Sequence, residues 1–361
     1  MFAGFLINRR LRAVLVRQRQ QQDAQMKSRI RLKPISQQVI VITGASSGIG
    51  RATAEAAADK GAKLVLASRD GEALQQMVDA FQRVGTEAVA VTADVGIEDD
   101  HRRILAEALT RFGRVDTWVN NAGVSIFGRI EDVSFEDQRK LFETNFWGVV
   151  YGSVVALGHL KTHGGALINL GSEVSDVAVP LQGAYSASKH AVKGYTDALR
   201  LELEDEGAPV SVTLIKPAAI DTNFVHNAKN YLDVEAQLPP PIYVPELAAD
   251  AILYAATHPI RDVYVGGASK AASTLARYAP GLMDKLGGMF IRQQRSSVPS
   301  SGQGGALHAS RHAPGKRGNT SQPVLEHSMY TRMTTTGRSM AMAGLVVGAV
   351  VGLMLLPRSR R

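Results

Sequence analysis

The stretch Thr43-Gly44-Ala45-Ser46-Ser47-Gly48-Ile49-Gly50 decides the fold of this 361-residue chain. It follows an apolar, β-branched run, 39–43, that is typical of a buried parallel strand, and it leads into a helical pattern. Gly44 permits a tight turn, Gly48 lets the backbone approach a phosphate group, and Gly50 lets the helix pack against the sheet. A helix that begins here directs unpaired N–H groups and the positive end of its dipole at the loop. An ordinary strand–helix turn can look the same, so the prediction of a phosphate-binding loop depends on the surrounding sequence.

Short apolar runs alternate with helical stretches along the following two hundred residues. Strands are expected at 39–43, 63–67, 87–92, 115–119, 166–170, 210–215 and 262–265. Helices are expected at 48–60, 70–84, 97–112, 135–160, 184–206 and 245–257. This alternation predicts an α/β fold of the Rossmann type, a doubly wound, seven-stranded parallel sheet flanked by helices, with a helical C-terminal extension.

Charge is distributed unevenly along the chain. The formal net charge of +8 consists of +8 over residues 1–38, −9 over 39–290 and +9 over 291–361. An acidic body therefore carries two basic extensions, which argues against nucleic acid as a partner and favours an anionic or membrane surface for the extensions. The chain has no cysteine, so disulfides, thiolate metal sites and cysteine nucleophiles are excluded, and we predict no metal.

Composition divides the chain into a main domain and flanking segments. The expected segments are a basic N-terminal extension (1–35), the α/β domain (36–270), a helical extension (271–295), a disordered linker (296–339), an apolar helix (340–356) and a basic tail (357–361). The apolar helix contains no charged residue, which favours membrane attachment over docking on the protein or on a partner. The N-terminal extension is expected to be a solvated basic arm, with a membrane-surface helix as the alternative.

Four further features follow the loop in a fixed order. Asn120-Asn121-Ala122-Gly123 follows the fourth strand, and Tyr185-Ser-Ala-Ser-Lys189 opens a long helix. Ser172 lies thirteen residues before Tyr185, and Asn145 lies twenty-seven residues before Ser172. With the Gly-rich loop, these motifs resemble the short-chain dehydrogenase/reductase family over about residues 36–265. Each motif alone is weak, but their joint order and spacing are specific.

The resemblance implies a nicotinamide dinucleotide cofactor, and the second strand favours NADP(H) over NAD(H). Ser68-Arg69 stands where NAD sites usually carry an acid for the ribose 2′-hydroxyl. A carboxylate would repel a 2′-phosphate, whereas Arg69 can bind it with two N–H groups and Ser68 can donate a hydroxyl. The alternative is that Arg69 is a solvated surface arginine.

The motifs that match the family also assign the remaining cofactor contacts. Asp94 resembles the adenine contact, although it could equally cap a helix, and Ala218 stands where the family usually has glycine. The implied cofactor-binding residues are Gly44, Ser46, Ser47, Gly48, Ile49, Gly50, Ser68, Arg69, Asp94, Val95, Asn121, Ala122, Gly123, Tyr185, Lys189, Pro217, Ile220 and Thr222.

The resemblance implies Asn145, Ser172, Tyr185 and Lys189 as catalytic residues. Tyr185 and Lys189 are four residues apart on a predicted helix and share a face. A tyrosine pKa of ~10 is high for acid–base work at neutral pH, and a nearby ammonium should lower it. Tyr185 would then exchange a proton with the substrate oxygen, and Ser172 would hydrogen-bond that oxygen. In the family, the residue matching Asn145 holds, through its backbone, a water that is linked to the lysine.

The segment Phe224–Tyr243 would form a lid over the substrate, and its apolar content suggests a hydrophobic small molecule. We therefore predict an NADP(H)-dependent oxidoreductase that transfers a hydride between nicotinamide and a carbonyl or secondary alcohol, with reduction as the favoured direction. The alternative is a membrane-tethered NADP(H)-binding sensor or scaffold without turnover. By resemblance we also expect a homo-oligomer. The absence of cysteine fits a reducing compartment, so we expect a cytoplasmic catalytic domain, with membrane attachment through residues 340–356 as the further expectation.

Overall fold

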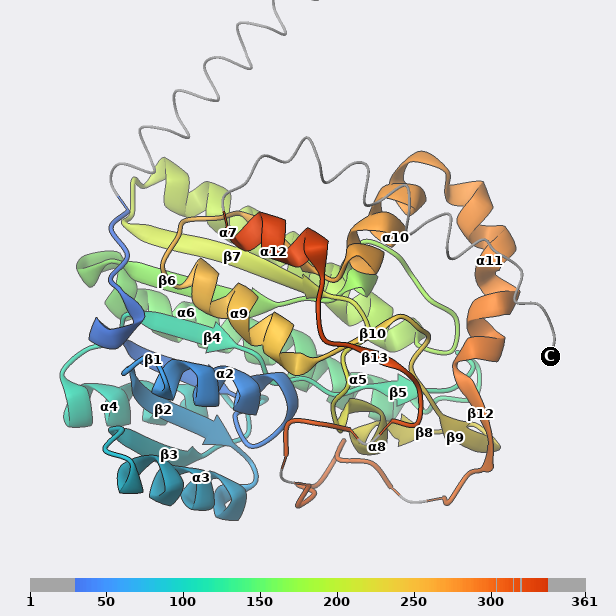
Figure 1. Cartoon of the computed structure of the whole chain (residues 1–361), viewed down its shortest axis with the longest axis horizontal. Helices are drawn as coiled ribbons and strands as arrows, with labels where there is room; N and C mark the ends of the chain where they lie inside the picture. Colours follow the sequence, from blue (N-terminus) through green and yellow to red (C-terminus); the bar gives the residue numbers. More distant parts are fainter. Residues whose placement is uncertain (1–29, 303, 314, 319, 337–361) are drawn as a thin grey trace, which may run out of the picture.

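The computed structural model describes residues 30–336 except 303, 314 and 319, and a seven-stranded sheet lies at its centre (Figure 1). Neighbouring strands all pair in parallel, in the spatial order β11-β7-β6-β4-β1-β2-β3. The strands are β1 (Val39–Thr43), β2 (Lys63–Ser68), β3 (Ala88–Thr92), β4 (Thr117–Asn120), β6 (Gly165–Leu170), β7 (Val210–Pro217) and β11 (Asp262–Val265). The predicted doubly wound sheet is confirmed. Its strand order reverses between β1 and β4, where such sheets bind ligands.

Helices cover both faces of the sheet. They are α2 (Gly48–Ala58), α3 (Gly71–Arg83), α4 (Glu98–Phe112), α6 (Gly148–His163), α7 (Gly183–Asp205) and α9 (Pro245–Ala255). Buried side chains of α2, α3 and α9 pack on one face, and those of α4, α6 and α7 pack on the other. Because both faces are covered, the strands between them are apolar at nearly every position rather than alternating.

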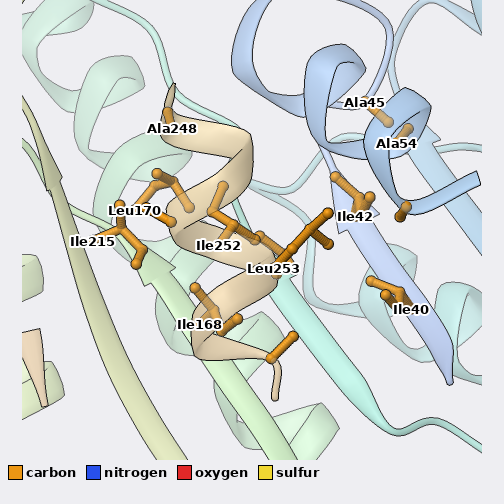
Figure 2. Close-up of a cluster of buried hydrophobic side chains, with 14 of the residues drawn as sticks. Ile40, Ile42, Ala45, Ala54, Ile168, Leu170, Ile215, Ala248, Ile252 and Leu253 are labelled. Atoms are coloured by element: carbon orange, nitrogen blue, oxygen red, sulfur yellow. The ribbon is translucent and has the colours of Figure 1, made fainter. Parts of the chain in front are cut away.

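The core between α9 and the sheet illustrates this packing (Figure 2). Ile252 of α9 is fully buried, and it belongs to the same cluster as Ile40 and Ile42 of β1 and Ile168 of β6. Val41 of β1 points to the opposite face, because successive strand residues alternate between faces. Burial of one such side chain contributes about 1.5–3 kcal/mol. This core fixes the strand ends from which the site is built.

The long helix expected at 135–160 is interrupted. It consists of α5 (Phe135–Phe142), a wider π-helical turn over Glu143–Trp147, and α6. Asn145 lies in this turn, fully buried, and its side chain exchanges two hydrogen bonds with the backbone of Val124. Such turns occur where a side chain is held away from the regular helical direction, often at functional sites.

Two helices and several short strands complete the C-terminal part. Helices α10 (Gly267–Tyr278) and α11 (Pro280–Gln293) follow β11 and stand beside the carboxyl end of the sheet (Figure 1). Three small sheets tie later residues to earlier ones. They pair β5 (Ile126–Phe127) with β8 (Lys229–Asn230), β9 (Val234–Ala236) with β12 (Arg295–Pro299), and β10 (Ile242–Tyr243) with β13 (Val324–Leu325).

The segment expected to be a disordered linker, 296–339, departs from that expectation in its described part. It includes β13 and α12 (Met329–Thr335), and it buries Leu307, Ala306 and Tyr330. These three buried apolar side chains are enough to hold the segment in place because backbone hydrogen bonds also anchor it to the domain. We call residues 304–318, without 314, the strap, since they cross the carboxyl end of the sheet.

Both predicted surface-binding segments fall largely beyond the described residues. The apolar helix 340–356 lies outside them, as does the N-terminal extension up to residue 29, and their roles stay predictions. Across the described residues 30–336, no helix combines the length and the apolar character that a bilayer crossing requires.

Candidate active site

A cavity of about 1040 Å³ opens at the carboxyl ends of the strands. The Gly-rich loop and the ends of β2, β4, β6 and β7 form its floor, and α10, α11 and the strap form its outer walls. Ligand pockets commonly measure about 300–1,000 Å³, so this cavity has room for a large ligand and a second small one. Most of the residues singled out from the sequence meet here.

The Gly-rich loop wraps tightly against the end of β4. Gly44 has φ +64°, and a Cβ at this position would lie 2.8 Å from the Ala122 Cα. A Cβ on Gly50 would collide with the Gly44 carbonyl oxygen and lie 2.6 Å from the Asn121 amide nitrogen. Glycine is therefore required at 44 and 50 for the loop to close against Asn121.

Backbone N–H groups remain available at the start of α2. The Gly48 N–H donates to the Gly315 carbonyl of the strap at 3.0 Å. The N–H groups of Ile49 and Gly50 donate to no other described residue. Because they sit at a helix N-terminus that faces the cavity, they can bind an anionic group.

The end of β2 has a polar, partly basic surface. The Ser68 hydroxyl donates to the Ser46 hydroxyl at 2.9 Å and accepts the Asp70 N–H. The Asp70 carboxylate accepts the Ala73 N–H and so caps α3. Arg69 is not a freely solvated arginine, because its guanidinium donates to the Leu307 carbonyl at 3.2 Å and to that of Ala306.

Residues after β3 close the same end of the cavity. Asp94 accepts the Gly96 N–H at 2.9 Å and lies 3.3 Å from the Lys140 ammonium. Burial alone would raise the pKa of Asp94, but these two partners hold it below its usual value. Asp94 and Val95 both line the cavity.

Asn121 joins β1 to β4. Its amide group donates to the carbonyls of Thr43 and Gly44, at 2.8 and 3.2 Å. The Thr43 hydroxyl in turn accepts the N–H groups of Asn121 and Ala122. A Cβ on Gly123 would lie 3.4 Å from Asn145 Oδ1, so the chain passes close to the next cluster.

The four residues expected to be catalytic gather around the end of β6. Lys189 donates to the Leu170 carbonyl at 2.7 Å, and its Nζ lies 5.9 Å from the centre of the Tyr185 ring. Asn145 donates to the Ser188 hydroxyl at 3.1 Å. Ser172, Tyr185 and Lys189 line the cavity. Asn145 does not line the cavity, but it is hydrogen-bonded to Val124, which does.

Burial changes the protonation of this cluster. Burial raises the pKa of the Tyr185 phenol, the Ser172 hydroxyl opposes that rise, and the charge of Glu173 adds to it. Burial lowers the pKa of Lys189 to about 8. The expected lowering of the Tyr185 pKa is therefore not found, because burial of the phenol outweighs the opposing hydrogen bond. Tyr185 is held in its protonated form at neutral pH.

The segment after β7 faces the Gly-rich loop. Ile220 pairs with Tyr243, and a Cβ on Gly48 would lie 3.1 Å from the Thr222 Cβ, so Thr222 closes over the loop. Pro217, Ile220 and Thr222 line the cavity, and the Ala218 N–H donates to the Val265 carbonyl. Alanine therefore fits at 218 without disturbing the turn.

The lid expected at Phe224–Tyr243 borders the cavity in part. Phe224 opens the short helix α8 (Phe224–Asn227), and its ring lies 5.3 Å from the Tyr185 ring. Leu238 and Pro239–Pro241 also line the cavity. Tyr231 instead turns away, since its hydroxyl donates to the Asp137 carboxylate at 2.7 Å.

Two further contributors, the apolar inner faces of α10 and α11 and the strap, were not anticipated from the sequence. Glu173 was expected to be a loop residue beside the site, and it also lines the cavity. The helical pattern after residue 266 was evident, and the position of Glu173 beside Ser172 was a usable signal. Nothing in the sequence marked the strap, whose residues are mostly small and polar.

The strap crosses the cavity from lid to Gly-rich loop. The Ala306 N–H donates to the Asn227 carbonyl at 2.7 Å, and the Gly318 N–H donates to the Asp221 carboxylate at 3.1 Å. Lys316 forms ion pairs with Glu55 at 2.9 Å and Glu246 at 3.3 Å. The strap is thus anchored on both sides of the cavity.

Comparisons with known proteins agree with this geometry. The family model described as short chain dehydrogenase matches residues 38–232. An uncharacterized oxidoreductase of Bacillus subtilis, YxnA, is 45% identical over 338 residues, which cover 92% of this chain and 94% of that protein. An 11-beta-hydroxysteroid dehydrogenase-like protein of Arabidopsis thaliana is 39% identical over 52% of this chain and 62% of its own length.

A solved structure is similar over most of the domain. The alcohol dehydrogenase of the archaeon Thermococcus sibiricus, complexed with 5-hydroxy-NADP, superposes with a TM-score of 0.56 at 30% identity. The match covers 63% of this chain and 95% of that one.

Proposed function

This chain belongs to the short-chain dehydrogenase family, and from that premise we propose that it is an NADP(H)-dependent oxidoreductase acting on a carbonyl group or secondary alcohol of a hydrophobic small molecule. The observation that carries the proposal is that Ser172, Tyr185 and Lys189 line the same cavity as the Gly-rich loop, whose Ile49 and Gly50 N–H groups donate to no described residue. The family match makes it an oxidoreductase. The cofactor preference and the substrate class are our proposal.

The residues present fit a nicotinamide dinucleotide. The N–H groups of Ile49 and Gly50 would hold the phosphates, and Thr222 faces them across the cleft. Asp94 and Val95 would border the adenine, and Ile220 with Pro217 would border the nicotinamide. When bound, this cofactor supplies or accepts the hydride.

The preference for NADP(H) is supported by the end of β2. Ser68 and Ser46 present hydroxyl groups there, Arg69 presents a guanidinium, and the nearby Asp70 carboxylate is engaged as a helix cap. A ribose 2′-phosphate would find hydroxyl and guanidinium donors at this place. The solved relative that was complexed with an NADP analogue is consistent with this preference.

The chain's own residues would then move a proton at the substrate oxygen. Tyr185 would donate it during reduction, the direction that the proposed NADP(H) preference favours. Ser172 would hydrogen-bond the same oxygen and stabilise its developing negative charge. Lys189 and Asn145 position this pair, through the Leu170 carbonyl and the Ser188 hydroxyl.

The substitution Tyr185→Phe tests the proposed role. We expect it to lower kcat for reduction of hydrophobic ketones and aldehydes by about 10²–10⁴-fold, because the proton donor is removed. The dissociation constant of NADPH should stay within a factor of about two, since the ring is retained. Turnover is measured from NADPH absorbance, and binding is measured by calorimetry.

Two results would contradict the proposal. Near-normal turnover by Tyr185→Phe would exclude Tyr185 as the proton donor. NADPH binding by the natural chain, without turnover on any carbonyl in a broad panel, would favour the sensor or scaffold alternative. Parallel assays with NADH in place of NADPH test the cofactor preference.

A further inference from the structure

We propose that Glu173 selects substrates that carry a hydrogen-bond donor, a hydroxyl or an ammonium group, within the apolar chamber that adjoins Tyr185. The inference rests on the proposed function and deepens it by naming a substrate class. The chamber is the part of the cavity walled by α10, α11 and the Pro239–Pro241 segment.

The backbone directs Glu173 into the site. It follows Ser172 directly and begins the short 3₁₀ turn Glu173–Ser175. Ser172 caps this turn, because its hydroxyl accepts the Val174 N–H while its own N–H donates to Ser175. The turn is therefore well fixed, and Glu173 lines the cavity rather than facing bulk solvent.

Much of the chamber wall is apolar, with Gln293 and Gln294 at the end of α11 as polar members. Helices α10 and α11 and the proline segment contribute apolar side chains to the chamber wall: Ala268, Ala271, Ala272, Leu275, Met283, Leu286, Met289, Phe290, Pro239, Pro240 and Pro241. Glu173 is the acidic residue among these walls, and its charge is felt by Tyr185 and Tyr243. It therefore lies close to the proposed proton donor.

No described residue satisfies the Glu173 side chain. Its backbone carbonyl accepts the Asp176 N–H at 3.1 Å, but its carboxyl forms no hydrogen bond or ion pair with another described residue. Asp176, three residues later, is the opposite case, because it pairs with Lys216 at 3.1 Å and accepts the Tyr264 hydroxyl. Burial without a partner raises the pKa of Glu173 to about 7.

A half-buried carboxyl that lines a cavity and has no partner among the described residues makes a site selective. A ligand that offers a donor would satisfy the group, whereas an apolar ligand of equal shape would leave it desolvated and unpaired. Sites built to hydrogen-bond a substrate group discriminate more strongly than apolar pockets, which separate analogues by only about 10–200-fold per methylene. We therefore expect at least a tenfold preference for the ligand with the donor.

Three ketones of nearly equal size test this selectivity. They are 4-(hydroxymethyl)acetophenone, 4-(aminomethyl)acetophenone and 4-ethylacetophenone, reduced by the full chain with NADPH. With the natural chain, kcat/KM for the hydroxyl and ammonium ketones should exceed that for the ethyl ketone by about tenfold or more. Comparing the two donor ketones shows whether the charge or only the donor matters.

Two variants assign the preference to Glu173. Glu173→Leu should abolish it by raising kcat/KM for the ethyl ketone and lowering it for the other two. Glu173→Gln should keep a preference for the hydroxyl ketone and lose most of that for the ammonium ketone. Asp176→Asn is the control, since Asp176 does not line the cavity, and it should leave the preference unchanged.

The outcome separates this inference from the proposed function. Equal kcat/KM for all three ketones in the natural chain, or a preference that Glu173→Leu leaves intact, overturns the role of Glu173 while oxidoreductase activity stands. If neither these ketones nor any carbonyl of the broad panel is turned over, the proposed function fails. Calorimetric dissociation constants of the three ketones, measured on the chain with NADPH, then test the selectivity. The two donor ketones should bind about tenfold more tightly than the ethyl ketone.

Discussion

At the scale of single residues, the site depends on groups whose protonation is changed by burial. Lys189 has a pKa lowered to about 8, while its neighbour Tyr185 is held protonated. Lys189 is therefore charged below about pH 8 and loses its charge above it. The ammonium would favour a negative charge developing on the substrate oxygen, so its loss should slow reduction.

We expect kcat/KM for reduction of 4-ethylacetophenone to fall above about pH 8, by up to about tenfold per pH unit. Lys189→Arg should be slower overall but show no fall below pH 10, because a guanidinium keeps its charge. Glu173→Gln, which removes the other group that titrates near neutrality, should retain the fall. A flat profile for the natural chain between pH 7 and 10 would exclude Lys189 as the controlling group.

At the scale of elements, the site is built where a strand ends and a helix begins. The Gly-rich loop joins β1 to α2, and Asn121 binds it to the end of β4. The π-helical turn between α5 and α6 plays a similar part, since it turns Asn145 toward Val124 and Ser188. Small changes in the spacing of these elements should therefore affect binding before they affect the fold.

Gly50→Ala tests the spacing of β1 and α2. The new methyl group would collide with the Gly44 carbonyl, so α2 must shift away from the loop. We expect NADPH affinity to fall at least about tenfold and the free energy of unfolding to fall by about 1–3 kcal/mol. Calorimetry and urea unfolding measure the two quantities.

Gly158→Ala provides the matched control for that change. Gly158 lies in α6 with open space at its Cβ position, so alanine there should leave NADPH affinity unchanged. It should raise stability by up to about 1 kcal/mol through its better helix propensity. Equal effects of both substitutions would contradict the role given to Gly50.

At the scale of the whole molecule, the C-terminal part returns to enclose a site built by the first 270 residues. The strap binds Arg69, Gly48 and Asp221, which follow three different strands, β2, β1 and β7. Its contacts with Glu55 and Glu246 add ion pairs at the surface, each of which contributes about 0–1 kcal/mol. We expect the strap to slow the release of a cofactor bound beneath it.

Gly318→Ala tests whether the strap retains the cofactor. A methyl group on Gly318 would collide with the Thr222 carbonyl, so the strap must lift there. We expect NADPH to dissociate several-fold faster, because the loss of about 1 kcal/mol of binding free energy raises a dissociation rate by about that factor. Stopped-flow fluorescence of NADPH measures this rate.

Gly304→Ala controls for a change within the same segment. Gly304 has open space around its Cβ position, so alanine there should leave the dissociation rate unchanged. Slower dissociation from Gly318→Ala than from the natural chain would show that the strap does not hold the cofactor in place.

The sequence by itself determined the sheet, its alternating helices and the residues that line its carboxyl end. Those features depend on short-range patterns: apolar runs at the strand period, the Gly-rich turn, and the four-residue spacing of Tyr185 and Lys189. Parallel strands bring their carboxyl ends to one edge, so the candidate site followed from the pattern.

Only the tertiary structure decided how the site is enclosed and tuned. The partners of Arg69 lie more than two hundred residues away in the strap, and the apolar helices around Glu173 lie about one hundred residues after it. Burial of Lys189 and Tyr185 reversed the direction expected for the tyrosine pKa. Such effects depend on which distant segments pack together and exclude water, and the local sequence pattern does not specify that packing.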